Sequence, residues 1–424
     1  MRALAPAGVV LALVALLCGP LVAGVEAEKN GKHAAALNQA DWRRDLQYFA
    51  AELPKRHKNL FHSVSRAEFD RAVAELDAAI PSLEDHQIAV GMMRIAASVG
   101  DGHTGVHVPK EFKRYPLILY WFERDLRVIA VPAGNAPQSH LGARLVAIGG
   151  LDIAEVQARV RGCFPSAENE NEWYVMSTSP SFIVRPEILH ALKVVPDLGA
   201  ATFTFEDDQG KRFDVELVPI AGEGGASRQW TRPSASEPLS RQRPGERFWF
   251  TDLPESQTVY VSFRGYESLG ENARKLFEFL DANPTRRVVI DLRQNGGGDF
   301  FEGRRHLIRP LQDRPAINQQ GRLFVLVGRQ TFSAAMVNAI DFRKETNATL
   351  VGEPIGERPN SYSENDEMTL PNSRLVVSYS TRYYEFLEQD VPAVLPDQRI
   401  DPSWDVYKSG GDPVMDWILS DASR

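Results

Sequence analysis

The chain has 424 residues, with 48 Lys or Arg against 56 Asp or Glu, and its formal net charge is −8. A chain of this length usually forms about two or three domains. The negative balance argues against nucleic acid or an anionic membrane surface as the partner. Beyond the N-terminal region no segment is apolar for long enough to span a bilayer, so we expect no membrane span in the mature chain.

Residues 1–27 have the pattern of a secretory signal peptide. An apolar core at Val9–Leu17 is followed by small residues at Val25–Ala27, where cleavage is expected, with Val22–Gly24 as an alternative site. The apolar core is short for an uncleaved anchor. We therefore predict export, either to the periplasm or out of the cell. After cleavage Cys163 is the only cysteine, so no intrachain disulfide is expected.

Composition and periodicity divide the mature chain into segments. Apolar residues recur at helical spacing before residue 99, and a capping box at Ser65–Glu68 opens one of these helices. Short apolar runs then predict strands, whereas Ala221–Gly245 is rich in Gly, Ser, Pro and Arg and is expected to be a linker. The predicted segments are a helical region at 28–98, a histidine-bearing segment at 99–114, a β domain at 115–220, the linker at 221–245 and an α/β domain at 246–424.

Arg322–Arg343 reads as a strand, a tight turn and a helix. Arg322–Gly328 is a nearly continuous apolar run, typical of a strand buried on both faces, and Ala334–Arg343 has the pattern of a helix. Ser333 therefore falls at the helix N-terminus, where backbone N–H groups and the helix dipole favour developing negative charge. In this position Ser333 is either a reactive nucleophile or an ordinary N-cap.

A glycine-rich loop follows a second buried strand. Arg287–Leu292 has the pattern of a buried strand, and Asn295–Asp299 (NGGGD) follows at its carboxyl end. Glycines admit positive φ and let backbone N–H groups approach a ligand closely. The N–H of Gly297 or Gly298, paired with that of Ala334, would form an oxyanion hole. The alternative is a glycine turn with no chemical role.

The segment VGDGHTGVHV brings His103 close to Asp101. His103 and His107 are four residues apart, a spacing that would suit zinc on a helix. The glycines and valines around them indicate a turn and a strand instead. His57 and His62 fit no tight metal motif and are interpreted as ordinary loop or groove histidines. We therefore expect neither a metal nor any other cofactor.

These segments together resemble peptidase family S41, which includes the tail-specific C-terminal processing proteases, the tricorn core and the interphotoreceptor retinoid-binding repeats. The strings that carry the resemblance stand at 100–104, 288–299, 325–335 and 351–360, and the tail at 391–401 resembles the family's closing segment. The resemblance covers most of the mature chain. It implies an α/β fold with a ClpP/crotonase-like spiral ββα catalytic domain at 246–424, and a PDZ-like β domain at 115–220.

The same resemblance bears on the catalytic base. The tail-specific branch uses a lysine after its Gly-Glu-Pro string; counting without gaps places Arg358 there, and a one-residue shift places Glu357 there. Arginine does not lose its proton at physiological pH and cannot act as a base. The tricorn-like branch uses the histidine that matches His103. We therefore expect Ser333 as the nucleophile and His103 as the base, as in that branch.

The acid that would orient His103 stays open. Asp101 is nearest in sequence, and Glu385 is a long-range candidate, with Glu353 and Glu364 as further alternatives. On a strand, residues two apart share a face without necessarily touching, so proximity in sequence does not choose among them.

The sequence as a whole predicts an exported serine peptidase that acts on peptides or unfolded proteins. The alternative is a non-catalytic protein that binds apolar ligands or peptides on the same fold, as the retinoid-binding repeats do. The β domain at 115–220 either adds an extended peptide to a sheet edge or is purely structural. Within it, Cys163–Pro186 is a polar interruption that we interpret as a lid. No oligomeric state is predicted.

Overall fold

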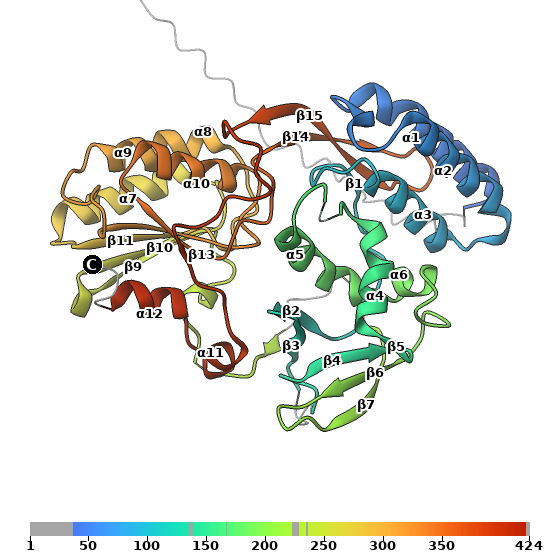
Figure 1. Ribbon diagram of the computed structural model, residues 1–424, viewed down its shortest axis with the longest axis horizontal. Helices are drawn as coiled ribbons and strands as arrows, with labels where there is room; N and C mark the ends of the chain where they lie inside the picture. Colours follow the sequence, from blue (N-terminus) through green and yellow to red (C-terminus); the bar gives the residue numbers. More distant parts are fainter. Residues whose placement is uncertain (1–36, 135–138, 167, 223–228, 235, 421–424) are drawn as a thin grey trace, which may run out of the picture. The chain divides into compact units, whose positions relative to one another are not determined.

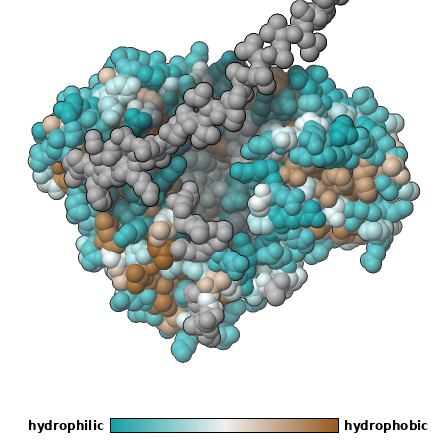
Figure 2. Space-filling view, turned by 180° about the vertical axis from the view of Figure 1, so that it is seen from behind, coloured by the Kyte–Doolittle hydropathy of each residue, from teal (hydrophilic) through white to brown (hydrophobic). Residues whose placement is uncertain are grey.

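The computed structural model describes residues 37–134, 139–166, 168–222, 229–234 and 236–420. The predicted signal peptide lies outside these residues. Within them no helix is both long enough and apolar enough to cross a membrane. On the face that Figure 2 shows, most of the surface is hydrophilic and the apolar side chains gather in separate patches. Most of the large apolar side chains are buried in the core clusters described below.

The N-terminal region is helical, as its periodicity predicted. It consists of α1 (Gln39–Arg56), α2 (Arg66–Ala79) and α3 (Asp85–Ala97). The predicted capping box opens α2: the Ser65 hydroxyl accepts the N–H of Glu68, and the Glu68 carboxylate accepts the N–H of Ser65. The apolar faces of the three helices are buried in one core cluster together with the β domain.

The C-terminal half contains a six-stranded sheet in the order β16-β13-β12-β11-β10-β9. Its strands are β9 (Phe248–Leu253), β10 (Thr258–Phe263), β11 (Arg287–Asp291), β12 (Leu323–Val327), β13 (Thr349–Gly352) and β16 (Gln398–Arg399). All neighbouring strands are parallel except β9, which pairs antiparallel with β10. The carboxyl ends of β11 and β12 therefore meet at one edge of the sheet, where the glycine loop and the Ser333 turn follow.

Helices cover both faces of this sheet (Figure 1). They are α7 (Leu269–Ala282), α8 (Phe300–Gly303), α9 (Arg309–Gln312) and α10 (Ala334–Glu345) on one face, and α12 (Pro413–Leu419) on the other. Buried side chains of α7, α9 and α10, with the partly buried Phe300 of α8, belong to one core cluster, and those of α12 belong to another. This double cover explains why β11 and β12 are continuous apolar runs. The α/β class predicted from the sequence is confirmed.

The β domain is a seven-stranded sheet in which β2-β3-β4-β6-β7 are neighbours, β5 pairs with β4 and β8 pairs with β3. Its strands are β2 (Ile118–Phe122), β3 (Asp125–Pro132), β4 (Arg144–Ile148), β5 (Leu151–Asp152), β6 (Ala201–Glu206), β7 (Arg212–Leu217) and β8 (Trp230–Thr231). Between β5 and β6 the chain forms α4 (Ile153–Val160), α5 (Glu172–Ile183) and α6 (Pro186–Ala191), and α11 (Trp404–Ser409) follows β16. The likeness of this domain to PDZ domains stays a prediction.

A long hairpin joins the α/β domain to the N-terminal helices. Strands β14 (Asn360–Thr369) and β15 (Val376–Glu385) pair antiparallel, and β1 (Gly105–Val106) adds to the edge of β15. At the turn of the hairpin, Asp45 of α1 accepts the N–H groups of Asn372 at 2.9 Å and Ser373 at 2.6 Å. The hairpin is thus fixed at its tip and lies against the segment that carries His103.

Candidate active site

Ser333 lies in the turn between β12 and α10, at the carboxyl edge of the α/β sheet. Its backbone has φ +54° and ψ −127°, a strained conformation for a residue with a side chain. Its hydroxyl makes no capping hydrogen bond with the first turn of α10. The interpretation of Ser333 as an ordinary N-cap is therefore wrong, and a strained serine between a strand and a helix is the geometry of a nucleophile elbow.

The glycine loop after β11 holds this turn in place. The Asn295 carbonyl accepts the N–H of Phe332 at 3.0 Å, and the Asn295 side chain donates to the Phe263 carbonyl at 3.0 Å. Gly297 has φ +112° and lies against Ser333, where an added methyl group would come within 2.6 Å of the serine Cβ. Position 297 therefore requires glycine for its backbone and for its close approach to Ser333.

The predicted oxyanion hole requires backbone N–H groups that have no partner. The N–H of Gly297 is already used, because it donates to Asn295 Oδ1 at 3.0 Å. The N–H groups of Gly298 and Ala334 find no acceptor among the residues that the structure describes. Of the two loop amides that the sequence left open, Gly298 is the one available to an oxyanion.

His103 lies in the loop between α3 and β1 and is only 8% exposed. Its ring stacks on Phe332 with 4.7 Å between centroids, and its Nε2 is 3.3 Å from Ser363 Oγ. Burial lowers the pKa of His103 to about 4, against the opposing effect of the Asp101 charge. The ring is therefore neutral at pH 7 and keeps the lone pair that a general base needs. In the described part of the chain no hydrogen bond joins it to the Ser333 hydroxyl, a contact that such sites often complete only with substrate bound.

Glu357, just after β13, connects Ser333 and His103. One of its carboxylate oxygens accepts the N–H of Ser333, and the other lies 3.8 Å from His103 Nδ1. Both of these facing atoms, Glu357 Oε1 and His103 Nδ1, are buried without a hydrogen-bond partner. An approach of roughly 1 Å would join them in a hydrogen bond. Burial raises the pKa of Glu357 well above its usual range, and the charge of Glu170 adds to this effect.

Arg358, which counting without gaps places at the lysine position of the tail-specific branch, points away from Ser333. Its guanidinium lies 3.3 Å from Asp390 and donates to the Glu168 carbonyl at 3.1 Å. The one-residue shift, which places Glu357 at this position, therefore agrees with the structure. The Glu357 carboxylate lies against the turn that carries Ser333.

None of the four acids that the sequence left open to orient His103 has a hydrogen bond with its ring, and Glu353 and Glu364 pair with Arg329 and Arg382. Asp101 instead accepts the backbone N–H of His103 at 3.2 Å and the Ser380 hydroxyl at 2.6 Å. Glu385 is exposed at the end of β15. Asp101 thus fixes the main chain at His103, and the carboxylate that faces the imidazole is that of Glu357.

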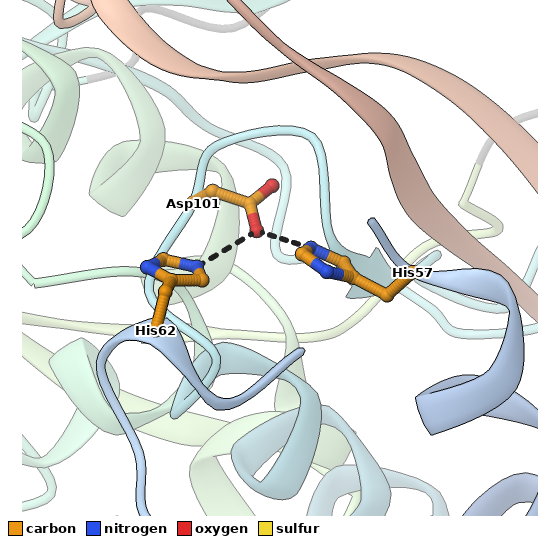
Figure 3. A group of neighbouring side chains, drawn as sticks. All are labelled: His57, His62 and Asp101. Atoms are coloured by element: carbon orange, nitrogen blue, oxygen red, sulfur yellow. Dashed lines mark hydrogen bonds and ion pairs between the residues drawn. The ribbon is translucent and has the colours of Figure 1, made fainter. Parts of the chain in front are cut away.

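Two histidines from the N-terminal region share the second oxygen of Asp101 (Figure 3). His57 Nε2 and His62 Nε2 lie 3.0 Å and 3.5 Å from Asp101 Oδ2, and the carboxylate points between the two rings. Burial alone would raise the pKa of Asp101, but hydrogen bonds from His57, His62 and Ser380 outweigh it and hold the pKa below its usual range. Asp101 is therefore ionised at neutral pH, and its donors fix the loop that carries His103.

This group of side chains does not suit a metal ion. His57 Nδ1 accepts the N–H of Asn59 at 2.9 Å, so the ring proton sits on Nε2, and that atom has no lone pair to offer a metal beside Asp101. The other such group in the described residues contains His86 and His190. Their facing nitrogens are 2.8 Å apart, closer than the roughly 3.3 Å between two nitrogen ligands of tetrahedral zinc.

Glu170 is a second buried carboxyl group at the site, and no sequence motif pointed to it. Its two oxygens accept the N–H of Gly102 at 2.5 Å and the N–H of Arg358 at 3.1 Å. It therefore binds the loop of His103 and the loop of Glu357 at the same time. Burial raises the pKa of Glu170 to about 7, although the two backbone hydrogen bonds lower it.

Helix α5, in the segment interpreted as a lid, lines two cavities beside these residues. Their volumes are about 380 Å³ and about 330 Å³. Both are lined by Tyr174 and Thr178 of α5, and by Gly102 and Phe332, and His103 lines the second. A substrate bound beside His103 would therefore contact α5, while movement of α5 as a lid stays a prediction.

Residues 257–398 match the model of peptidase family S41. Among solved structures, that of mature CPAF complexed with lactacystin matches with a TM-score of 0.58 and 11% identity, over 90% of this chain and 98% of that chain. Mature CPAF matches with a TM-score of 0.56 and 10% identity, over 90% of this chain and 96% of that chain. At this level of identity the likeness shows a shared fold. No curated protein sequence matches the chain.

Proposed function

We propose that the chain is a serine-type peptidase of family S41, whose model matches residues 257–398, and that Ser333, His103 and Glu357 carry the reaction. Ser333 is the nucleophile, His103 is the general base, and Glu357 orients the imidazole. The observation that carries this proposal is the position of Glu357, which accepts the Ser333 N–H with one oxygen and faces His103 Nδ1 with the other.

Each group has the property that its role requires. The neutral imidazole of His103 accepts the hydroxyl proton while the Ser333 oxygen attacks the carbonyl carbon of the substrate. The N–H groups of Gly298 and Ala334 bind the oxyanion that forms. The carboxylate of Glu357 stabilises the imidazolium, which then gives its proton to the leaving amine. Water repeats these steps on the acyl-enzyme and frees Ser333.

One contact has to change when substrate binds. Nε2 of His103 now faces Ser363 Oγ at 3.3 Å, and the Ser333 hydroxyl must replace Ser363 as its partner. Closing the 3.8 Å separation between Nδ1 and Glu357 is part of the same adjustment. The approach of Nδ1 to Glu357 requires a shift of roughly 1 Å, the difference between 3.8 Å and a good hydrogen bond.

A fluorophosphonate probe tests the assignment of the nucleophile. We expect covalent labelling of the purified protein at neutral pH, with the label found on the peptide that contains Ser333. Ser333→Ala should abolish the labelling, whereas Ser363→Ala, which removes the other hydroxyl near His103, should preserve it. Labelling that persists in folded Ser333→Ala, or a folded wild-type protein that stays unlabelled, would contradict the proposal.

The family implies peptide or protein substrates, and two finer points from the sequence belong to this proposal. Residues 1–27 are a signal peptide that is removed on export, which N-terminal sequencing of the exported protein would test. The β domain binds an extended peptide by edge addition, which binding of substrate peptides to the Ser333→Ala protein would test. The strain at Ser333 argues against the alternative of a purely binding protein, since a binding site has no need of it.

A further inference from the structure

A further cavity, of about 240 Å³, lies at the carboxyl ends of β12 and β13. Val327 and Gly352, the last residues of these strands, are part of its wall. Gln294, Arg329 and Gln330 line both this cavity and the 380 Å³ cavity beside α5. The two cavities therefore adjoin at the turn that leads from β12 to Ser333.

Four arginines line this further cavity, and two of them are neutralised within the protein. Arg293 lies 2.7 Å from a carboxylate oxygen of Asp291 and 2.8 Å from one of Asp412. Arg329 forms an ion pair with Glu353. The charges of these two arginines are offset, and their donors are used to hold the sheet edge together.

The other two, Arg232 and Arg241, have no carboxylate partner among the residues that the structure describes. Both contact Tyr407 instead: Arg232 Nη1 lies 3.3 Å from the tyrosine hydroxyl, and the Arg241 guanidinium lies 4.3 Å from the ring centroid. Contact with Tyr407 limits the orientations of each guanidinium but leaves most of its N–H donors free. In a chain of net charge −8, two arginines without a carboxylate partner in the described residues thus lie beside the candidate active site.

We propose that this cavity binds a carboxylate of the peptide substrate, held by Arg232 and Arg241. The proposal rests on the peptidase function proposed above and adds a preference to it. A guanidinium binds a carboxylate through two parallel charged hydrogen bonds, a geometry that either arginine can offer beside Tyr407. The carboxylate comes either from an Asp or Glu side chain or from the C-terminus of the substrate, and the two sources share this chemistry.

Four matched peptides test the proposal and separate the sources. They share one cleavable sequence and carry either Glu or Gln at a position that is scanned along the peptide, with a C-terminus that is either free or amidated. In the wild-type protein we expect a carboxylate to raise kcat/KM by about tenfold, mainly through KM, as one charge-assisted contact would. A preference that depends on Glu identifies a side chain, and a preference that amidation removes identifies the C-terminus.

The double variant Arg232→Gln, Arg241→Gln should reduce this preference to near one, with kcat on the amidated Gln peptide unchanged. Arg243→Gln is the matched control. Arg243 belongs to the same segment and also lies over an aromatic ring, Trp249, at 4.9 Å, but it does not line the cavity. Arg243→Gln should keep the full preference. Equal kcat/KM for all four peptides in the wild type, or a preference that survives in the double variant, would overturn the proposal.

A measurement of peptide binding distinguishes a failure of the proposed subsite from a failure of the proposed peptidase function. The dissociation constants of the same peptides are measured with the Ser333→Ala protein, in which no turnover is needed. Binding that is tighter for the carboxylate peptides, and that loses this difference when Arg232→Gln and Arg241→Gln are added, supports the subsite whatever residue is the nucleophile. Equal dissociation constants for peptides with and without the carboxylate would contradict the subsite, even if the wild-type protein hydrolyses the peptides.

Discussion

The two halves of the active site are built in different ways. The serine half consists of the glycine loop and the Ser333 turn, which follow two neighbouring strands of one sheet, and both strands are buried throughout. The histidine half brings together His103, Glu357 and Glu170 from distant segments, and buried carboxylates hold it together. One half rests on apolar packing, and the other rests on ionisable groups.

This difference has a consequence for how each half responds to pH. Burial of apolar side chains does not depend on protonation, whereas a hydrogen bond to a carboxylate changes when the carboxylate takes up a proton. We therefore expect the nucleophile to keep its geometry over a wide pH range. The activity should be limited by the histidine half, and the variants below test that expectation.

The largest effect is expected at the two residues that exchange the proton. Ser333→Ala and His103→Ala should each reduce kcat by on the order of 10⁴-fold or more, because nucleophile and base act as a unit. For the same reason the double variant should be little worse than either single one. Turnover of a peptide substrate measures all three. Losses that simply multiply would mean that the two residues act independently.

Glu357→Gln should have the next largest effect, a loss in kcat on the order of 10²–10⁴-fold. Burial lowers the pKa of His103 to about 4, and an ionised Glu357 beside Nδ1 would stabilise the protonated ring. Loss of the charge should therefore move the acid limb of the pH–rate profile to lower pH than in the wild type. Arg358→Ala is the control: its guanidinium points to Asp390, and its effect should stay within about threefold. An acid limb that does not move would show that Glu357 does not act on His103.

Within the serine half, Gly297→Ala should cost on the order of 100-fold in kcat. The new methyl group would come within 2.6 Å of the Ser333 Cβ and would occupy a backbone with φ +112°, so the nucleophile and its neighbouring amides would shift. The adjacent Gly296→Ala is the matched control, because nothing lies within 4 Å of the added atom. If both variants keep normal turnover, the loop is only a turn.

Glu170→Gln should have the smallest effect on activity, about tenfold, because one of its two backbone hydrogen bonds loses its acceptor. Its effect on stability is more informative. The pKa of Glu170 rises from an ordinary value of 4.5 to about 7 in the folded protein. The contribution of Glu170 to the free energy of unfolding is therefore complete below pH 4.5. It is lost, by roughly 3 kcal/mol, as the pH rises through about 7.

Urea denaturation of the wild type and of Glu170→Gln, at pH 5 and at pH 8, measures this contribution. The wild type should lose more stability than the variant between the two pH values. The comparison has to be a difference between proteins, because Glu357 also has a raised pKa and adds a loss of the same sign. An equal loss in both proteins would mean that Glu170 stays ionised in the folded state.

The same contrast between the halves explains how much of the site could be predicted from the sequence. The serine half was predictable because its residues are contiguous: an apolar run gives the strand, and the residues just after it give the turn. Even here, the sequence left two roles open for Ser333, and only the backbone geometry argues against an ordinary N-cap. His103 was identified through a family resemblance, since its own segment carries little local signal.

The acids of the histidine half could not be predicted in the same way. Glu357 differs by one residue from the position that gap-free counting selects, and only its side-chain direction distinguishes it from Arg358. Glu170 stands in a polar segment that resembles any loop, and its burial depends on the packing of three distant segments. Asp101 was recognised as important, but its hydrogen bond is with the main chain of His103 and not with its ring.

The hairpin β14–β15 also sets the moment at which activity arises during synthesis. The ribosome completes His103 long before Ser333, but Glu357 and Ser363, which face the imidazole, follow Ser333, and the strand that pairs with β1 comes later still. Domains fold as they emerge, N-terminal segments first. A nascent chain therefore carries a histidine without its carboxylate and, later, a serine without its base. On the assignment proposed above, hydrolysis requires almost the whole chain, so we expect an unfinished chain to be inactive.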